Sequence, residues 1–155
     1  MTIEEILRME RLGALPLSRP TCVHSSTSLD ETLKVMRPGG IGAVLICDGE
    51  KLIGIFTERD VLFKLFGSKV DLRQPIEKFM TRGPKVLSTE NTLGDALRLM
   101  TQSGYRNIPL QDEQGRRAGM ITTREILKYV AEHFPAEVMN LPPHPDQTFQ
   151  APEGA

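Results

Sequence analysis

The sequence has little of what membrane proteins and nucleic-acid-binding proteins need. Its 155 residues carry 19 Lys and Arg against 20 Asp and Glu, a formal net charge of −1, with the two signs interspersed along the chain. No basic stripe is present that would follow a phosphate backbone, so a nucleic-acid partner is not expected. No apolar run approaches the ~20 residues that cross a bilayer. The N-terminus, acidic at Glu4 and Glu5, lacks the layout of a signal peptide. We therefore expect a cytoplasmic protein with no membrane partner.

Cysteine is scarce as well. Cys22 and Cys47 are the only two, and they form neither a CxxC pair nor an evenly spaced framework. We expect both to be reduced, buried thiols. Cys22 and His24 lie two apart on a predicted strand, hence on one face, but no second pair stands at metal-ligand spacing. No metal site is predicted.

The motifs of the common catalytic classes are missing too. The chain contains no GxxxxGK[ST], HExxH, GxSxG or complete GxGxxG pattern. The glycines at 39, 40 and 42 precede an apolar strand instead of following one, which is wrong for a dinucleotide-binding fold. We expect a protein that is not an enzyme and that needs no obligatory cofactor.

What the sequence does have is a core-forming composition and an internal repeat. Hydrophobic residues make up 39% and charged residues 25%, as in soluble globular domains. Laid over itself, the chain matches at an offset of 64 and, beyond a predicted turn, at 65. The matched pairs are Leu29/Leu93, Leu33/Leu97, Met36/Met100, Gly40/Gly104, Asp48/Asp112, Gly54/Gly119, Thr57/Thr122, Arg59/Arg124 and Leu62/Leu127. This indicates a tandem repeat of a β-α-β-β-α unit.

The repeat predicts the fold class. Each unit has roughly 55 residues, too few to bury a generous core alone, so two units should pack sheet against sheet in an α+β fold. We predict an N-terminal helix within residues 1–13, a first unit at 14–72 and a second at 73–136. A Pro-rich tail at 137–155 should be extended, disordered or docked on a partner.

One helix leaves its role open. A helix at 61–66 follows the first unit's return strand, and core burial is the simplest use of its apolar residues. The same face could instead serve a dimer. The residues expected to face inward are Val61, Leu62, Leu65 and Phe66.

Residues 54–60 (GIFTERD) and their echo at 119–125 (GMITTRE) gather a hydroxyl and a carboxylate where a strand runs into a helix. A helix N-terminus has free N–H groups and a partial positive charge, which suit a phosphate. A carboxylate one turn in can accept two hydrogen bonds from a cis-diol. The Gly in each strand could leave room for a flat base. The predicted ligand site therefore includes the strand residues Ile55 and Met120.

A second interpretation of the same residues is purely structural. Thr or Ser followed three positions later by Asp or Glu is a capping box, and the chain has five of them. Arg59 and Arg124, two positions after each Thr, are better explained as solvated or interface residues than as phosphate ligands. The five boxes are Thr2/Glu5, Ser28/Glu31, Thr57/Asp60, Thr92/Asp95 and Thr122/Glu125.

With these motifs the sequence resembles a tandem pair of cystathionine-β-synthase-type (CBS) domains, the Bateman module, over about residues 14–136. The resemblance rests on residues 54–60, 78–84 (KFMTRGP) and 104–112 (GYRNIPLQD), and on the repeat itself. It implies a regulatory sensor with two clefts between the paired domains. The ligands implied are adenosine-containing, such as AMP, ADP, ATP or S-adenosylmethionine.

The resemblance also implies roles for individual residues. Thr57 and Thr122 would face phosphate, and Asp60, with Glu125 in the second unit, would hold the ribose hydroxyls. Arg106 would also meet phosphate.

The two clefts should then be unequal. Beside Arg106 lies the weaker candidate Asn107, and Arg106 could equally pair with Asp112 or Glu113. The counterpart of Arg106 in the first unit is Gly42, which has no side chain for phosphate. The second unit, however, has Glu125 where the first has Asp60, and Glu is one methylene longer. We therefore favour the first copy as the ligand site.

Family members often pair through their helices into a flat homodimer, and ligand binding would shift the angle between repeats or protomers. A target protein, not identified by the sequence, would then read the change. The alternative function is a structural dimerisation domain whose clefts stay empty.

Overall fold

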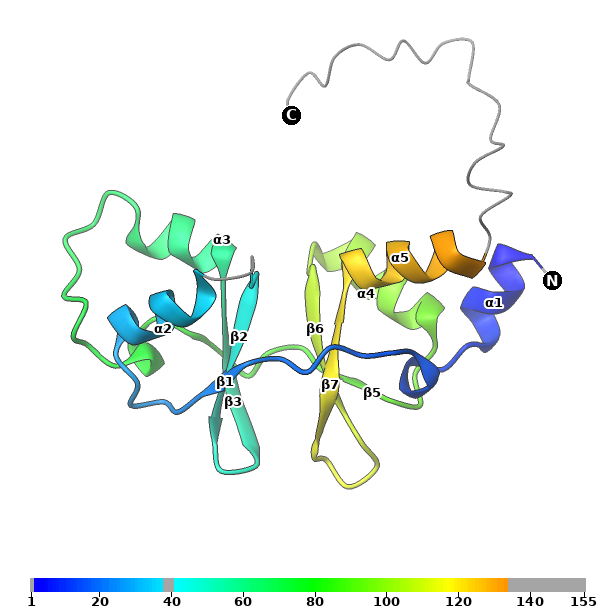
Figure 1. Ribbon diagram of the computed structural model, residues 1–155, viewed down its shortest axis with the longest axis horizontal. Helices are drawn as coiled ribbons and strands as arrows, with labels where there is room; N and C mark the ends of the chain where they lie inside the picture. Colours follow the sequence, from blue (N-terminus) through cyan, green and yellow to red (C-terminus); the bar gives the residue numbers. More distant parts are fainter. Residues whose placement is uncertain (1, 38–40, 134–155) are drawn as a thin grey trace, which may run out of the picture.

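Two β-sheets face each other across the centre of the molecule, and helices cover their outer sides (Figure 1). The computed structural model describes residues 2–37 and 41–133. The first sheet has the order β1 (Cys22–Val23), β2 (Ala43–Asp48), β3 (Lys51–Thr57) and β4 (Thr81–Arg82). The second has the order β5 (Leu87–Ser88), β6 (Asn107–Gln111) and β7 (Arg117–Thr122). The predicted α+β fold, with two repeats packed sheet to sheet, is confirmed.

The helices follow the repeat. In the first unit α2 (Leu29–Met36) and α3 (Glu58–Asp60) lie outside the first sheet, and α3 continues as a π-helical segment, η3 (Val61–Leu65). In the second unit α4 (Leu93–Ser103) and α5 (Thr123–His133) lie outside the second sheet. Two 3₁₀ turns, η1 (Leu12–Ala14) and η4 (Ile76–Lys78), and the N-terminal helix α1 (Ile3–Met9) complete the described elements.

Strand pairing matches between the halves. The edge strands β1 and β5 run parallel to β2 and β6, while the hairpins β2/β3 and β6/β7 are antiparallel. In register, Ala43 opposes Thr57 and Asn107 opposes Thr122. Each threonine that opens a predicted ligand site therefore ends the return strand of its hairpin.

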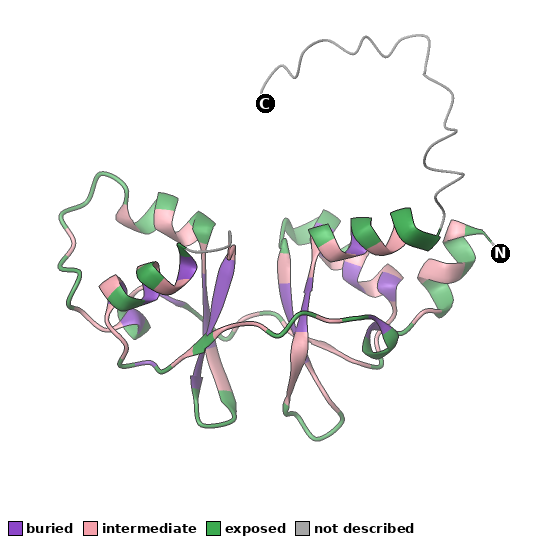
Figure 2. Cartoon of the chain, in the orientation of Figure 1, coloured by how far each residue is buried: buried purple, intermediate pink, exposed green. Residues whose placement is uncertain are grey.

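Alternation along β2 divides the buried side chains between two faces. Val44 and Ile46 belong to the core under the helices of the first unit. Ala43, Leu45 and Cys47 point to the other sheet, where they pack with Ile55 and Met120. Buried residues accordingly concentrate in the central strands and the inner helix faces (Figure 2).

Each core is completed by a segment that precedes the opposite repeat. Leu12 is fully buried in the second unit's core, and its N–H donates to the carbonyl of Asn91 at 2.8 Å. Ile76, 64 positions later, is fully buried in the first unit's core, and its N–H donates to Thr27 at 2.7 Å. We call residues 10–20 and 74–82 the first and second crossing segments. The predicted boundary between the two units, at residues 72 and 73, stays a prediction. The cores are built differently, because each includes a crossing segment that precedes the other unit.

Two predictions of burial are wrong. Val61 and Leu65 pack on the first core, but Leu62 and Phe66 are 64% and 84% exposed. A helix lying on a sheet buries one stripe, and two residues four apart fill it, so their neighbours point to solvent. Cys22 is also exposed, because it lies in the short edge strand β1, whereas Cys47 is buried as expected.

Some predictions fall on residues outside the described part of the chain. They are the helix stop at 38–40, Phe134 and the tail at 137–155. Among the described residues, none of the helices is both long enough and apolar enough to cross a membrane.

The crossing predicts a dependence of the second unit on its distant N-terminal segment. Leu12→Ala should lower the free energy of unfolding by about 2–5 kcal/mol, because it empties a fully buried site. Met9→Ala, at the end of α1 just before this segment and 67% exposed, is the matched control and should change stability little. Urea unfolding of both variants measures the difference. Equal effects would contradict the crossing.

Candidate functional site

The first predicted site residues form a closed hydrogen-bonded unit at the end of β3. The N–H of Thr57 donates to Asp60 Oδ2 at 2.9 Å, and the N–H of Asp60 donates back to Thr57 Oγ1 at 3.2 Å. The other carboxylate oxygen, Oδ1, pairs with Lys64 Nζ at 3.1 Å and accepts from Thr81 Oγ1 at 3.5 Å. The Asp60 side chain is 13% exposed. Both of its oxygens are therefore engaged by the chain itself.

The second site has the same cap but no cation on its carboxylate. Thr122 N–H donates to Glu125 Oε2, and Glu125 N–H donates to Thr122 Oγ1, each at 3.2 Å. No ion pair of Glu125 occurs within the described residues. Burial raises the pKa of Glu125, although backbone hydrogen bonds from Thr122 and Ser18 act in the opposite direction. A partly desolvated carboxylate without a countercharge gains from new hydrogen-bond donors.

Arg106 immediately precedes β6 and lies beside the first residue of α5 (Thr123–His133). Its carbonyl accepts the N–H of Thr123 at 3.1 Å, just as the carbonyl of Gly42 accepts the N–H of Glu58 at 3.0 Å in the first unit. The Arg106 side chain is exposed and forms no hydrogen bond or ion pair within residues 2–37 and 41–133. Of the two residues whose carbonyls accept these N–H groups, Arg106 has a cationic side chain and Gly42 has none.

The alternative pairing of Arg106 is not observed. Asp112 pairs with Arg116 at 3.1 Å, and neither Asp112 nor Glu113 contacts Arg106 as an ion pair. Asn107, the other candidate in this strand, opposes Thr122 in register. The structure thus brings Arg106, Asn107, Thr122 and Glu125 together.

Ile55 and Met120 have a different place from the polar candidates. They are 8% and 6% exposed and pack in one cluster between the sheets. Each stands two positions before a site threonine, hence on the same strand face. They connect the two sites through the inter-sheet core.

The expectation that glycines leave room for a base is wrong. A Cβ on Gly54 would lie 2.4 Å from Met80 Sδ, and a Cβ on Gly119 would lie 3.0 Å from Leu17 Cβ. Met80 and Leu17 belong to the two crossing segments. The glycines therefore allow a crossing segment to pack closely against each return strand.

Sequence reasoning missed two hydroxyl residues, Ser18 and Thr81. Thr81 pairs in register with Ile55, and Ser18 bridges to Met120. Thr81 contacts the Asp60 carboxylate, and Ser18 contacts that of Glu125 through its backbone. The available signal was a second echo, LSRP at 17–20 against MTRGP at 80–84.

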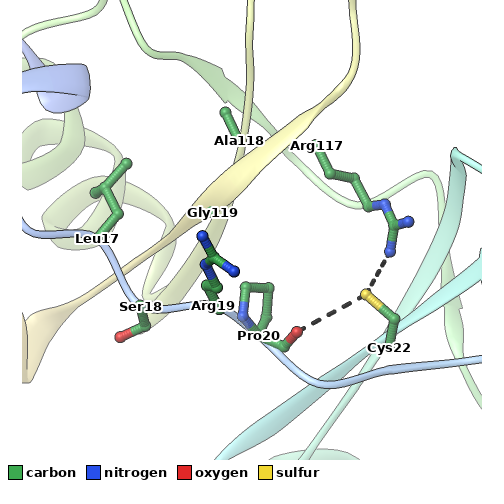
Figure 3. Close-up of a pocket in the computed structure, with 8 residues that line it drawn as sticks. All are labelled: Leu17, Ser18, Arg19, Pro20, Cys22, Arg117, Ala118 and Gly119. Carbon is green, nitrogen blue, oxygen red and sulfur yellow. Dashed lines mark hydrogen bonds between the residues drawn. The ribbon is translucent and has the colours of Figure 1, made fainter.

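A hollow of about 400 Å³ adjoins the second site (Figure 3). It lies between the first crossing segment and the beginning of β7, and Ser18 borders it. Its volume is within the range of small-ligand sites. Its lining residues are Leu17, Ser18, Arg19, Pro20, Cys22, Arg117, Ala118 and Gly119. No cluster of three or more His, Cys, Asp or Glu suited to a metal occurs among the described residues.

Comparisons with known proteins agree on the family. The CBS domain model matches residues 12–67 and 76–132. Inosine-5'-monophosphate dehydrogenase of Aquifex aeolicus is 30% identical over 81% of this chain, which spans 25% of that enzyme.

Two solved structures share the fold. A putative signal-transduction protein with CBS domains from Burkholderia ambifaria has a TM-score of 0.68 and 25% identity, covering 97% of this chain and 99% of that one. CBSX2 of Arabidopsis thaliana in complex with AMP has a TM-score of 0.68 and 22% identity, covering 80% and 98%. At that identity the second likeness concerns the fold alone. The predicted resemblance is confirmed: the chain belongs to the CBS domain family and carries a tandem pair of CBS domains.

Proposed function

We propose that this CBS pair is a regulatory module that binds an adenosine-containing ligand, such as AMP, ADP, ATP or S-adenosylmethionine, between its repeats. The observation that carries the proposal is the polar end of the second cleft. Arg106 and Glu125 lie on segments that meet at the start of α5, and neither side chain has an ion-pair partner in the described part of the chain. A cation and an anion left unpaired at one helix start suit a ligand with phosphate and hydroxyl groups.

The phosphate would lie at the start of α5. This helix has 11 residues, so its first N–H groups and its dipole favour an anion. Thr122 Oγ1 accepts the N–H of Glu125, and its hydroxyl hydrogen remains available to donate. Arg106 adds a guanidinium, which pairs with phosphate through two parallel hydrogen bonds.

The nucleoside would lie toward the hollow. Ser18 both borders the hollow and contacts Glu125, so a ribose at the carboxylate would leave its base near the hollow. CBSX2, a protein of the same fold, was solved in complex with AMP, which supports an adenine nucleotide as the class of ligand.

We expect the first cleft to bind more weakly. Lys64 and Thr81 already engage Asp60, and Gly42 offers no side chain for phosphate. A ribose there would have to displace the Lys64 ion pair. The sequence-based preference for the first copy stays an untested prediction, and the contacts favour the second.

A thermal-shift panel of AMP, ADP, ATP and S-adenosylmethionine tests the proposal. A bound ligand at one hundred times its Kd should add ~2.7 kcal/mol to the free energy of unfolding. Arg106→Ala should weaken nucleotide binding about tenfold or more, because a charge-assisted hydrogen bond is lost. Arg124→Ala, which removes an exposed arginine in the first turn of α5, is the matched control.

The outcome separates the two hypotheses. A structural dimerisation domain with empty clefts would show no stabilisation by any of the four compounds. Equal losses of affinity in the two arginine variants would place the phosphate away from Arg106.

Glu125→Gln should separate ligand binding from stability. Burial raises the pKa of Glu125, so the folded chain binds this proton more tightly than the unfolded chain. Above the folded pKa the charge therefore disfavours folding, and the amide removes that effect. We expect the variant to bind AMP more weakly and to keep or raise the Tm at pH 7. The Tm gap between variant and wild type should narrow as the pH falls through the folded pKa. A lower Tm for the variant at pH 7 would contradict this.

A homodimer is the assembly that we propose. Helices α3 and α5 lie at the same edge of the molecule (Figure 1). That edge exposes large apolar side chains: Leu62 at 64%, Phe63 at 75%, Phe66 at 84% and Leu127 at 66%. Such a patch typically marks an interface. A target protein would read a ligand-induced change in the dimer.

Phe66→Glu tests the dimer without disturbing the core, because Phe66 is almost fully exposed. We expect sedimentation to give a dimer for the wild type and a monomer for this variant. Leu72→Glu, at a 45% exposed position in the connector, should remain dimeric. A monomeric wild type would refute the proposed assembly.

A further inference from the structure

Two sulfur atoms and one guanidinium meet where the two units touch. Arg117 Nη1, from β7, contacts Cys22 Sγ (Figure 3). The same nitrogen lies 3.2 Å from Cys47 Sγ. Arg117 Nη2 donates to the carbonyl of Gly49 at 3.4 Å. The cysteines belong to the first unit and Arg117 to the second. One nitrogen atom thus contacts the sulfur atoms of both cysteines.

The two thiols differ in access and ionisation. Cys22 is exposed and borders the 400 Å³ hollow, so a small solute can reach its sulfur. Cys47 is 5% exposed. Burial, followed by the negative charge of a Cys22 thiolate, raises the pKa of Cys47 to about 11. Cys47 therefore remains a thiol at neutral pH, and Arg117 places its positive charge beside Cys22.

We infer that Cys22 and Cys47 form a redox-active thiol pair, in which a peroxide oxidises Cys22 and Cys47 then closes an intramolecular disulfide. In the first step the Cys22 thiolate attacks hydrogen peroxide, and the O–O bond breaks. Cys22 becomes a sulfenic acid, and the hydroxide released takes up the proton that Cys22 lost. In the second step Cys47 Sγ attacks Cys22 Sγ and loses its proton, and the S–O bond breaks to release water. Two thiols and one peroxide thus give one disulfide and two waters.

The strand geometry allows this bond. In the parallel pair β1/β2, Cys22 opposes Leu45, and Cys47 stands two positions further along the same strand face. Such diagonal neighbours have Cα atoms about 7–8 Å apart, just beyond the usual disulfide span. Strand β1 has two residues and lies at the sheet edge, so it can shift by the ångström or so that is needed. A disulfide closed in this way is easily reduced, which suits a reversible modification.

Oxidation would change the contact between the units. A disulfide sulfur carries no negative charge, so Arg117 loses the Cys22 thiolate as a partner and keeps the Gly49 carbonyl. Cys22 and Arg117 line the hollow toward which the nucleoside is proposed to lie, so the thiol chemistry is tested on the chain without nucleotide.

The experiment treats the full chain, which contains only these two cysteines, with a small excess of hydrogen peroxide. We expect both free thiols to disappear under denaturing conditions, with a mass loss of two hydrogen atoms and full recovery after dithiothreitol. The oxidised protein should run as a single chain on a non-reducing gel. Cys47→Ser should stop at a trappable sulfenic acid on Cys22. Cys22→Ser should stay unmodified under the same treatment, since its remaining thiol is buried.

Arg117→Met tests whether the positive charge of Arg117 promotes the reactivity of Cys22. Losing a partly exposed charge contact should slow the reaction of Cys22 with a thiol probe about two- to fivefold. Arg116→Met, the neighbouring exposed arginine, should react at the wild-type rate. Two free thiols after oxidation of the wild type would overturn the inference. So would chains linked through Cys22 in place of the intramolecular bond.

Discussion

The two crossing segments are the constraint on which the rest of the structure depends. Leu12 fills the core of the second unit and Ile76 that of the first, with backbone hydrogen bonds to equivalent carbonyls, those of Asn91 and Thr27. Burying a large aliphatic side chain contributes about 1.5–3 kcal/mol relative to leaving it in water. Part of the core of each unit is therefore supplied by the crossing segment that precedes the other unit. The repeats fold as one body even though the sequence presents them in tandem.

The same crossings build both ligand ends. Each segment passes over the glycine of the opposite return strand and brings a hydroxyl residue, Ser18 or Thr81, to the carboxylate at its end. A ligand at either carboxylate thus touches both units. Because Ile55 and Met120 pack together between the sheets, we expect a shift at one end to be transmitted to the other. This gives a physical route from ligand binding to the angle between the units.

Periodicity and the internal echo were enough to predict the hairpins, the edge strands β1 and β5 and the capping boxes, but not β4, the fourth strand of the first sheet. Thr57/Asp60, Thr92/Asp95 and Thr122/Glu125 all close as expected, because local hydrogen bonds determine them. The crossings could not be predicted in the same way, because Leu12 and Ile76 are buried by residues that are distant in the sequence. Leu62 and Phe66 were misplaced because periodicity shows that a helix has an apolar face, not how wide a stripe the sheet can cover. The Lys64–Asp60 ion pair, which distinguishes the two clefts, is likewise a product of the folded geometry.

The central claim is that the two clefts are unequal and that the second one binds the nucleotide. Titration calorimetry of AMP, ADP, ATP and S-adenosylmethionine into the intact chain tests it most directly, because the stoichiometry counts the occupied clefts. The account predicts that at least one of these ligands binds tightly at one site per chain, with any further binding much weaker. Two equivalent sites per chain, or no binding heat with any of the four, would contradict it.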